Sequence, residues 1–545
     1  MNGLPKMETT TITEYTPVLI VGGALTGLSS AVFLAWHGVP CVVVERHPDL
    51  LIHPRLRGLT PRTVELYRQV GLEPAIRAAS YASNEQFEWI AVRAETLASE
   101  TYLPAAERGE VDETESASPC AFGAIDQDRL EMLLRERARE LGADIRFATE
   151  LVSFEQDDGG VTALLRDRRT GAEHALRADY LIAADGASSG IRQQLEIELD
   201  GPGLLFHAIT AMIEADLTPA LRGRRVSIAY LELPQPYTLL MAHDDAGQRW
   251  IFGTGYDPAR QPVETFTDER VTALVREAAG LTDLKVTLFP QIPGTDRKVL
   301  GFAIGAQVAR RYRVGRIFLA GDSAHLVPPT DGFGGNAGVQ DAHNLVWKLA
   351  MVLQGQASPA LLDAYEAERR PVGLLTMQQA LARFGARMGP GAEIPVLDYA
   401  AVAMGYRYRS AAVAGAPDDD TPVRPRELSG QPGTRAPHLS VARDGREISS
   451  LDLYGRRFVL LAGPAGAAWM AAAERIAARV GIALDAYRFC VELGGADGTA
   501  AHGIRPDGAL LVRPDGFVAW RNEAGAEEPE RELERALSRV LGRAS

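Results

Sequence analysis

Residues 17–47 have the sequence PVLIVGGALTGLSSAVFLAWHGVPCVVVERH, and this stretch restricts the possible folds most strongly. An apolar run at 18–21 predicts a short buried strand, and residues 24–36 predict a helix of small and apolar side chains. Residues 41–44 predict a second strand that ends at Glu45. With glycines at the first strand–helix turn, this is a βαβ unit of about 30 residues of the dinucleotide-binding type.

Each residue of this corner has a physical task. Gly22 permits the tight turn, and Gly27 lets the helix pack closely on the strand. Ala24 occupies the position of the middle fingerprint glycine, so its methyl group crowds a bound pyrophosphate slightly. The carboxylate of Glu45 can accept hydrogen bonds from both ribose hydroxyls of an adenosine. The alternative is an ordinary turn of an α/β core, but the two strands and the acidic residue together favour a nucleotide site.

Two more apolar strands end in aspartate, at Asp185 and Asp322. The second belongs to GDSAHLVPPTDGFGGNAGVQDAHNLVWKLA, residues 321–350, in which a Pro-Pro pair and a glycine-rich loop precede a helix that we expect to begin near Asn336. A helix N-terminus carries partial positive charge. This corner therefore suits a flat, polar and partly anionic ligand.

Taken together, the glycine fingerprint with Glu45, the segment around Asp185 and the segment from Asp322 to Asn336 resemble the class A FAD-dependent aromatic hydroxylases of the para-hydroxybenzoate hydroxylase type. The resemblance covers about residues 15–415. The segments HPRLRG and GYRYRSAAV, with the tail, resemble the subgroup that hydroxylates aromatic polyketides such as anthracyclines, angucyclines and tetracenomycins.

The resemblance implies an α/β and α+β architecture: a Rossmann-like FAD-binding domain with an inserted antiparallel-sheet substrate domain, and a thioredoxin-like C-terminal domain. We place the boundaries at 15–195 with 300–415, 196–299 and 438–545. The Pro/Gly/Asp-rich residues 416–437 are expected to be a linker. The last domain contains no CxxC and so no dithiol chemistry, which leaves a role in packing or in supporting a homodimer.

The same resemblance assigns residues to FAD. Asp322 would bind the ribityl hydroxyls, and the helix after the glycine-rich loop would stabilise negative charge at the flavin edge. The residues expected to line the isoalloxazine ring are Pro328, Gly332, Gly335 and Asn336.

Four further cofactor contacts follow from the resemblance. Arg55 matches the arginine that reaches the pyrophosphate, although a surface arginine is the alternative. Gln127 matches a phosphate–ribityl contact, with a helix-capping role as the alternative, and Arg46 lies beside Glu45, near the adenosine. Asp185 is either structural or positioned where an extended nicotinamide cofactor passes.

Residues 200–300 contain strand-like apolar segments separated by turns, which predict an antiparallel sheet over the flavin. Its apolar and aromatic side chains favour a flat multi-ring ligand over a small phenol; they are Phe206, Met212, Ile228, Tyr230, Leu240 and Met241. A phenolic substrate needs a partner beside its hydroxyl, and we select Tyr230, from a local resemblance to anthracycline hydroxylases, and Arg387, expected near the flavin, as catalytic candidates; for Tyr230 a role in the core is the alternative. For His325 we favour a packing and hydrogen-bonding role over that of a base.

The predicted function is a monooxygenase that consumes NADPH or NADH and O2 and hydroxylates a polycyclic phenolic polyketide through a C4a-hydroperoxyflavin, in antibiotic or secondary-metabolite biosynthesis. The alternative is a flavin monooxygenase acting on small phenols or inactivating xenobiotics such as antibiotics. No Trp-x-Trp pair is present, which disfavours a flavin halogenase. A catalytically inactive flavoprotein is the remaining class.

Charge and cysteine content limit the partners. The formal net charge of −14 disfavours nucleic acid and anionic membranes. The three cysteines form no CxxC, which predicts neither a disulfide framework nor a metal site and fits a reducing, cytoplasmic location. The apolar stretch 18–36 is interrupted by glycines, so we interpret it as strand, turn and helix and not as a membrane span.

Overall fold

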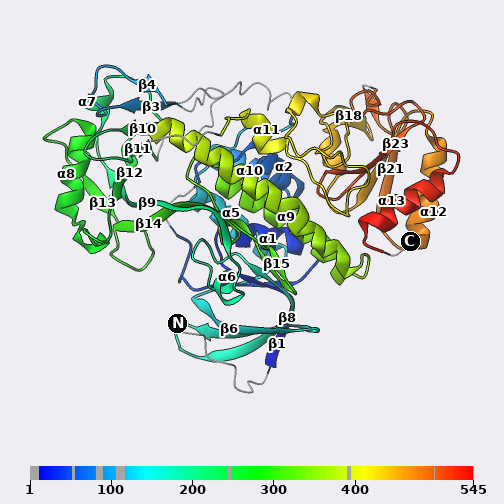
Figure 1. Ribbon diagram of the computed structural model, residues 1–545, viewed down its shortest axis with the longest axis horizontal. Helices are drawn as coiled ribbons and strands as arrows, with labels where there is room; N and C mark the ends of the chain where they lie inside the picture. Colours follow the sequence, from blue (N-terminus) through cyan, green and yellow to red (C-terminus); the bar gives the residue numbers. More distant parts are fainter. Residues whose placement is uncertain are drawn as a thin grey trace.

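The computed structural model contains three sheet-based units joined by two long helices (Figure 1). It describes residues 12–51, 56–80, 90–105, 117–243, 247–388, 394–495 and 497–543. Across these residues no helix combines the length and the apolar character that a membrane span requires.

The first unit is a largely parallel sheet in the order β15-β16-β8-β1-β2-β5, to which the hairpin β6–β7 is added. Its strands are β1 (Ile12–Val21), β2 (Cys41–Glu45), β5 (Asp144–Phe147), β6 (Thr149–Asp157), β7 (Gly160–Asp167), β8 (Glu173–Ala183), β15 (Arg313–Val314) and β16 (Ile317–Leu319). Helix α1 (Leu25–Trp36) connects the parallel strands β1 and β2. The predicted βαβ unit is therefore present, with its apolar residues buried.

Helices cover this sheet and pack on one another. The long helices α9 (Phe333–Leu353) and α10 (Asp363–Met388) run side by side through the centre of the molecule (Figure 1). The other helices around the sheet are α2 (Pro61–Gln69), α3 (Glu73–Ala79), α5 (Gln127–Glu140), α6 (Gly190–Gln194) and α11 (Tyr399–Met404). Most of α9 is buried, because its apolar residues contact α1 on one side and α10 on another.

The second unit is a sheet in the order β17-β14-β9-β12-β11-β10-β3-β4, with β13 also paired to β9. Its strands are β3 (Ala91–Ala94), β4 (Leu103–Pro104), β9 (Leu199–Glu214), β10 (Ile228–Leu231), β11 (Thr238–Ala242), β12 (Arg249–Tyr256), β13 (Thr287–Phe289), β14 (Val299–Ala309) and β17 (His325–Leu326). The central pairs are antiparallel, as expected, while β3 adds to β10 in parallel. This sheet therefore includes residues 91–104, which lie outside the segment 196–299 that was expected to form it.

One face of this second sheet is covered by helix. Helix α8 (Asp268–Ala279) packs on side chains of β9, β11 and β12, and the short helix α7 (Thr218–Leu221) adds to the same core. Because side chains alternate along a strand, the neighbouring positions point to the opposite face. That opposite face is turned toward the first unit.

The C-terminal unit has the thioredoxin-like strand order β21-β20-β23-β24. Strand β20 (Phe458–Ala462) is parallel to β21 (Leu484–Arg488) and antiparallel to β23 (Ala509–Val512), which is antiparallel to β24 (Val518–Asn522). Helices α12 (Ala467–Val480) and α13 (Pro529–Val540) pack against one face. A small sheet adds β18 (Ser440–Arg443), β19 (Arg446–Ser449) and β22 (Gly494–Gly495).

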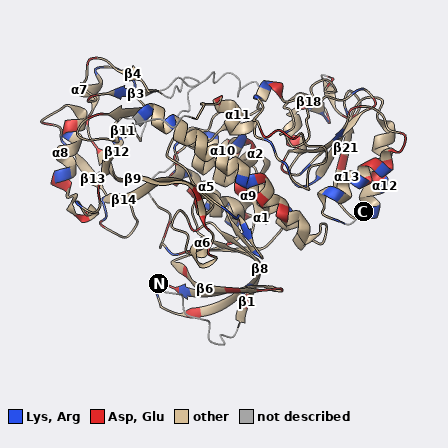
Figure 2. Ribbon diagram, viewed as in Figure 1, with Lys and Arg blue, Asp and Glu red and all other residues tan. Residues whose placement is uncertain are grey.

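Basic and acidic residues both occur along α12 and α13 (Figure 2). Arg475 of α12 pairs with Glu530 of α13 at 2.6 Å, and both side chains are largely or partly exposed.

The segment expected to be a linker between the units is partly buried. Residues 416–437 contain no strand and one short 3-10 helix, Pro425–Glu427, and near their end the buried Arg435 pairs with Glu65 of α2. This segment is therefore attached to the first unit by a buried ion pair.

Candidate active site

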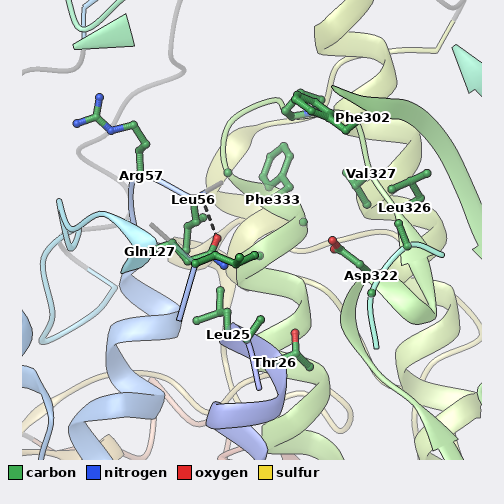
Figure 3. A pocket seen from close by; sticks show the side chains of 18 of the residues that line it. Leu25, Thr26, Leu56, Arg57, Gln127, Phe302, Asp322, Leu326, Val327 and Phe333 are labelled. Carbon is green, nitrogen blue, oxygen red and sulfur yellow. Dashed lines mark hydrogen bonds between the residues drawn. The ribbon is translucent and has the colours of Figure 1, made fainter. Parts of the chain in front are cut away.

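A cavity of about 2570 Å³ lies between the first unit and the open face of the second sheet. A pocket for one drug-sized ligand typically measures about 300–1,000 Å³. The cavity therefore has room for more than one ligand. Figure 3 shows the part of it where the loops before α1, α5 and α9 converge.

The βαβ corner forms one wall of the cavity. Gly22, with φ of +111°, and Ala24 both line it, and Ala24 is the N-cap of α1 without a side-chain cap. A Cβ at Gly22 would lie 2.2 Å from the carbonyl oxygen of Ala184. Gly27 does not line the cavity, but a Cβ there would lie 1.8 Å from the oxygen of Gly22. The two glycines thus keep the first turn of α1 against the cavity.

Glu45 and Arg46 follow at the end of β2, and both line the cavity. The Glu45 carboxylate accepts hydrogen bonds from the backbone N–H of Gly23 at 2.7 Å and of His47 at 2.9 Å. A carboxylate offers about four acceptor positions. Glu45 therefore anchors the glycine corner and can still accept from a ligand.

Gln127 lines the cavity from the first turn of α5 and is connected to the loop before α2. Its Oε1 accepts from the backbone N–H of Leu56 at 3.1 Å (Figure 3), and its Nε2 donates to Glu131 at 2.7 Å. Arg55 lies outside the described residues. Arg57 of the same HPRLRG segment lines the cavity, and its Nε donates to Asp126 at 2.7 Å. From this segment the sequence analysis selected Arg55 and overlooked Arg57, which stands two residues later.

Asp322 lines the cavity from the turn Gly321–Ser323, which follows β16 (Figure 3). Gly321 has φ of +65°, and a Cβ there would lie 2.4 Å from the Thr26 hydroxyl. Its N–H donates to Asp341 of α9 at 3.1 Å. His325 does not line the cavity, since it is buried beside the same Asp341 at 2.7 Å. The turn carrying Asp322 is thus fixed from both sides.

The loop 328–332 contributes Pro328, Asp331 and Gly332 to the lining, and the first turn of the following helix contributes Gly335. Helix α9 begins at Phe333, one turn earlier than the sequence suggested. Asn336 consequently lies inside the helix and not on the cavity: its Oδ1 accepts from Thr60 N–H at 2.9 Å, and its Nδ2 donates to Gly58 at 3.1 Å and Gly332 at 2.8 Å. Asn336 thus connects two loops that line the cavity, the loop before α2 and the loop before α9.

Asp185 also lines the cavity, after the end of β8. Its Oδ2 accepts from the N–H of Ile191 at 3.2 Å, at the start of α6. Burial raises the pKa of Asp185, with a hydrogen bond from Ser189 opposing the shift. Asp185 therefore both accepts a hydrogen bond from the start of α6 and lines the cavity.

The second sheet presents an apolar face to the cavity. Phe206, Tyr237 and Phe384 stack on one another, with ring centroids 3.9 Å apart for Phe206–Tyr237 and 5.6 Å for Phe206–Phe384. The three rings line the cavity together with aliphatic residues of β10, β11 and β12, namely Ile228, Leu239, Met241 and Ile251. Offset stacked rings of this kind are a favourable surface for another flat aromatic system.

Two residues that were expected to line this cavity do not line it. Leu240 alternates with Leu239 and Met241, so it points to the core beneath α8 and is fully buried. Met212 lines a separate pocket of about 540 Å³ beside β13. Alternation along each strand identifies two faces, but only the packing of α8 decides which face is open.

A polar cluster interrupts this apolar surface. Arg387, near the C-terminal end of α10, donates to Asp331 at 2.6 Å and lies close enough to Tyr230 of β10 for its charge to act on the pKa of that phenol. Arg383, one turn earlier, pairs with the other Asp331 oxygen at 3.1 Å. Burial raises the pKa of Tyr230, and the nearby Arg387 charge opposes that rise. The two catalytic candidates therefore meet at one point of the cavity wall, with Asp331 as their shared neighbour.

Comparison with known families gives two matches that together span most of the chain. The family described as FAD binding domain matches residues 15–380. The family described as aromatic-ring hydroxylase, C-terminal, matches residues 429–544.

Individual relatives extend over nearly the whole length. The chain is 41% identical to tetracenomycin A2 monooxygenase-dioxygenase of Streptomyces glaucescens, over 98% of each chain. It is 43% identical to 4-methyl-5-nitrocatechol 5-monooxygenase of a Burkholderia species, over 97% of this chain and 98% of the relative. Among solved structures, aklavinone-11 hydroxylase in a ternary complex with FAD and aklavinone matches with a TM-score of 0.89 at 39% identity, over 98% of this chain and 100% of that one.

Proposed function

This chain belongs to the family of FAD-dependent aromatic-ring hydroxylases, and from that membership we propose that it hydroxylates a polycyclic phenol of the aromatic polyketide class in antibiotic or secondary-metabolite biosynthesis. The observation that carries the substrate class is the apolar face of stacked rings with the polar cluster of Arg387, Asp331 and Tyr230 beside it. Burial of apolar surface contributes about 25 cal/mol per Å², so a flat ligand of several rings gains most from this face.

The site fits FAD. A Cβ at Gly22 would clash with Ala184 and one at Gly27 with Gly22, so these two glycines let the uncapped N-terminus of α1 sit at the cavity, which suits a pyrophosphate. The residues that would hold the cofactor are Gly22, Ala24, Glu45, Arg46, Arg57, Gln127, Asp322, Pro328, Gly332 and Gly335, with Gly27 and Asn336 positioning their loops. FAD, when bound and reduced by NADPH or NADH, supplies the chemistry that activates O2 for ring hydroxylation.

Helix α9 provides fixed electrostatics to this site. Its first turn begins at Phe333, directly after the cavity-lining Gly332, and no side chain caps it. A helix N-terminus is equivalent to about half a positive charge. Because α9 is buried and anchored, it would stabilise negative charge on a bound ligand without reorganising.

Tyr230 and Arg387 would act on the phenol. A substrate hydroxyl beside the Arg387 guanidinium would lose its proton more readily, because a nearby cation lowers the pKa of a phenol. Tyr230 would keep its own proton, since burial raises its pKa, and its hydroxyl would donate a hydrogen bond to the phenolate oxygen. A phenolate ring is more electron-rich and so more reactive toward an electrophilic oxygen. Asp331 holds Arg387 in place for this task.

A second candidate is a hydroxylase of single-ring phenols or of xenobiotics. It is supported by the 43% identity to the relative named 4-methyl-5-nitrocatechol 5-monooxygenase. On this alternative the same polar cluster would bind the phenol, and much of the apolar face would stay uncovered. In either case O2 and a nicotinamide nucleotide would be co-substrates, and a homodimer and a cytoplasmic location remain our expectations.

Stopped-flow flavin reduction distinguishes the two candidates. The holoenzyme is mixed with NADPH and with NADH, each in the presence of three- and four-ring phenolic polyketides, 4-methyl-5-nitrocatechol or para-hydroxybenzoate, and products are identified by mass. We expect the polycyclic phenols alone to accelerate reduction and to leave with one added oxygen. A single-ring phenol that accelerates reduction equally and leaves hydroxylated would overturn the polyketide assignment.

A further inference from the structure

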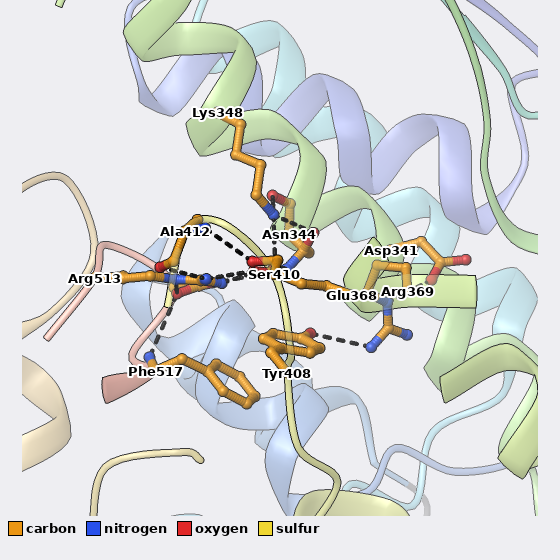
Figure 4. A network of polar contacts seen from close by, with 11 residues as sticks. Asp341, Asn344, Lys348, Glu368, Arg369, Tyr408, Ser410, Ala412, Arg513 and Phe517 are labelled. Atoms are coloured by element: carbon orange, nitrogen blue, oxygen red, sulfur yellow. Dashed lines mark hydrogen bonds and ion pairs between the residues drawn. The ribbon is translucent and has the colours of Figure 1, made fainter. Parts of the chain in front are cut away.

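The turn Arg513–Phe517 connects β23 to β24 in the C-terminal domain and enters the first unit (Figure 4). Arg513 is fully buried, and its two terminal nitrogens donate to the two carboxylate oxygens of Glu368 on α10, at 2.5 and 3.0 Å. Its Nε donates to Asp515 at 3.0 Å. A bidentate arginine–carboxylate pair fixes both distance and orientation. The C-terminal domain is therefore attached to α10 at a defined position.

Glu368 connects this turn to α9. It accepts from Lys348 Nζ at 2.8 Å, from Asn344 Nδ2 at 2.8 Å and from the Ser410 hydroxyl at 2.7 Å. Although burial alone would raise the pKa of Glu368, the Arg513 and Lys348 cations hold it well below its ordinary value. Two buried cations thus balance two buried anions, Glu368 and Asp515.

The next residue of α10, Arg369, contacts α9 behind the turn that carries Asp322. Its Nε donates to Asp341 at 2.7 Å, and another nitrogen donates to the backbone oxygen of Ala337 in α9 at 3.2 Å. The second oxygen of Asp341 accepts from the N–H of Gly321, the residue before Asp322. One carboxylate therefore joins α10 to the turn that carries Asp322.

Two more contacts extend from the same C-terminal turn. The ring of Phe517 stacks on Tyr408 with centroids 4.1 Å apart, and the Tyr408 hydroxyl accepts from Arg369 at 3.1 Å (Figure 4). The backbone oxygen of Asp515 accepts from Arg62 of α2 at 2.9 Å. Helix α2 begins after Thr60, whose N–H is bonded to Asn336. The turn thus contacts α10 and α2 directly and α9 through Glu368, and the loops before α2 and α9 line the cavity.

We propose that the turn Arg513–Phe517 of the C-terminal domain is a positioning element for the cofactor loops, acting through Glu368, Arg369 and Asp341 on the turn that carries Asp322. The thioredoxin-like domain contributes no side chain to the cavity lining among the described residues, so its effect is indirect. Buried ion pairs stabilise little compared with apolar packing, but they tolerate only one arrangement of their partners. Such a network suits the placement of loops.

The test compares Arg513→Met with Arg475→Met, which breaks an exposed ion pair of the same domain far from the network. Apoprotein of each variant is titrated with FAD by fluorescence, and melting temperatures are recorded with and without FAD. We expect Arg513→Met to weaken FAD binding about tenfold, a typical size for such coupling, and to reduce the FAD-dependent rise in melting temperature. Arg475→Met should leave both unchanged.

A purely structural role for Arg513 would lower the melting temperatures of the apo and FAD-bound forms equally and leave FAD affinity unchanged, which overturns the proposal. If Arg513→Met does not fold, Arg513→Lys and Tyr408→Phe decide the question. Arg513→Lys keeps the positive charge but cannot form the bidentate pair with Glu368. Tyr408→Phe removes only the hydroxyl that accepts a hydrogen bond from Arg369. Both should weaken FAD binding while the chain stays folded. Since FAD affinity is measured without a substrate, the result is independent of the proposed polyketide specificity.

Discussion

Replacing Gly27 by alanine is the most direct test of the proposed pyrophosphate site at the first turn of α1. The added Cβ would lie 1.8 Å from the carbonyl oxygen of Gly22, whereas ordinary van der Waals contacts begin at 3.4 Å. Both atoms belong to the backbone or are fixed to it, so α1 must move away from β1 by roughly 1.6 Å, the difference between these two distances. A hydrogen bond of about 2.9 Å from the first turn of α1 to a pyrophosphate would then be broken.

The expected cost follows from the hydrogen bonds that this displacement of α1 would break. Two hydrogen bonds to a charged phosphate, at about 1.5 kcal/mol each, amount to about 3 kcal/mol, or a loss of FAD affinity of about 150-fold. Equilibrium titration of the apoprotein with FAD measures this value. Gly38→Ala is the control, because Gly38 follows the other end of α1 at a φ of +76° with no atom within 4 Å of an added Cβ. That variant should be less stable yet bind FAD normally. FAD affinity of Gly27→Ala equal to that of the parent chain would refute the argument.

Three further changes have defined outcomes. Asp322→Ala should yield a protein that retains little FAD, since a hydrogen bond to a charged group is worth about 1.5–3 kcal/mol, and a fully yellow purified variant would contradict the assignment. Glu45→Ala should weaken FAD binding while saturating FAD restores turnover, because we propose that Glu45 binds the adenosine end; persistent loss of turnover would place it elsewhere. Burial lowers the pKa of His502 from 6.5 to about 4, so the unfolded chain binds a proton that the folded chain refuses. The free energy of unfolding should therefore fall by about 3 kcal/mol as the pH drops from 6.5 toward 4, and chemical denaturation should show a shallower fall in His502→Asn.

The sequence alone determined the local strand–turn–helix geometry on which the proposed cofactor site is built. Gly22, Gly27 and Glu45 were identified correctly as parts of a βαβ unit because a tight turn, a close helix–strand contact and a strand end are set by neighbouring residues. Asp322 lies on the cavity for the same reason, as it follows a buried strand within a few residues. Such features depend on local backbone geometry, which a short stretch of sequence specifies.

Only the tertiary structure decided which distant side chains meet. Arg387 was named from its segment alone, yet its hydrogen bond to Asp331 and its position beside Tyr230 depend on where the end of α10 lies relative to the loop before α9 and to β10. The displaced Leu240 shows the same limit, since alternation gives two faces and the packing of α8 selects between them. Arg513 carries no local signal at all: its role depends on Glu368, a partner that the docking of two domains brings into contact. Contacts between residues far apart in sequence depend on how whole elements pack, and no single segment encodes that packing.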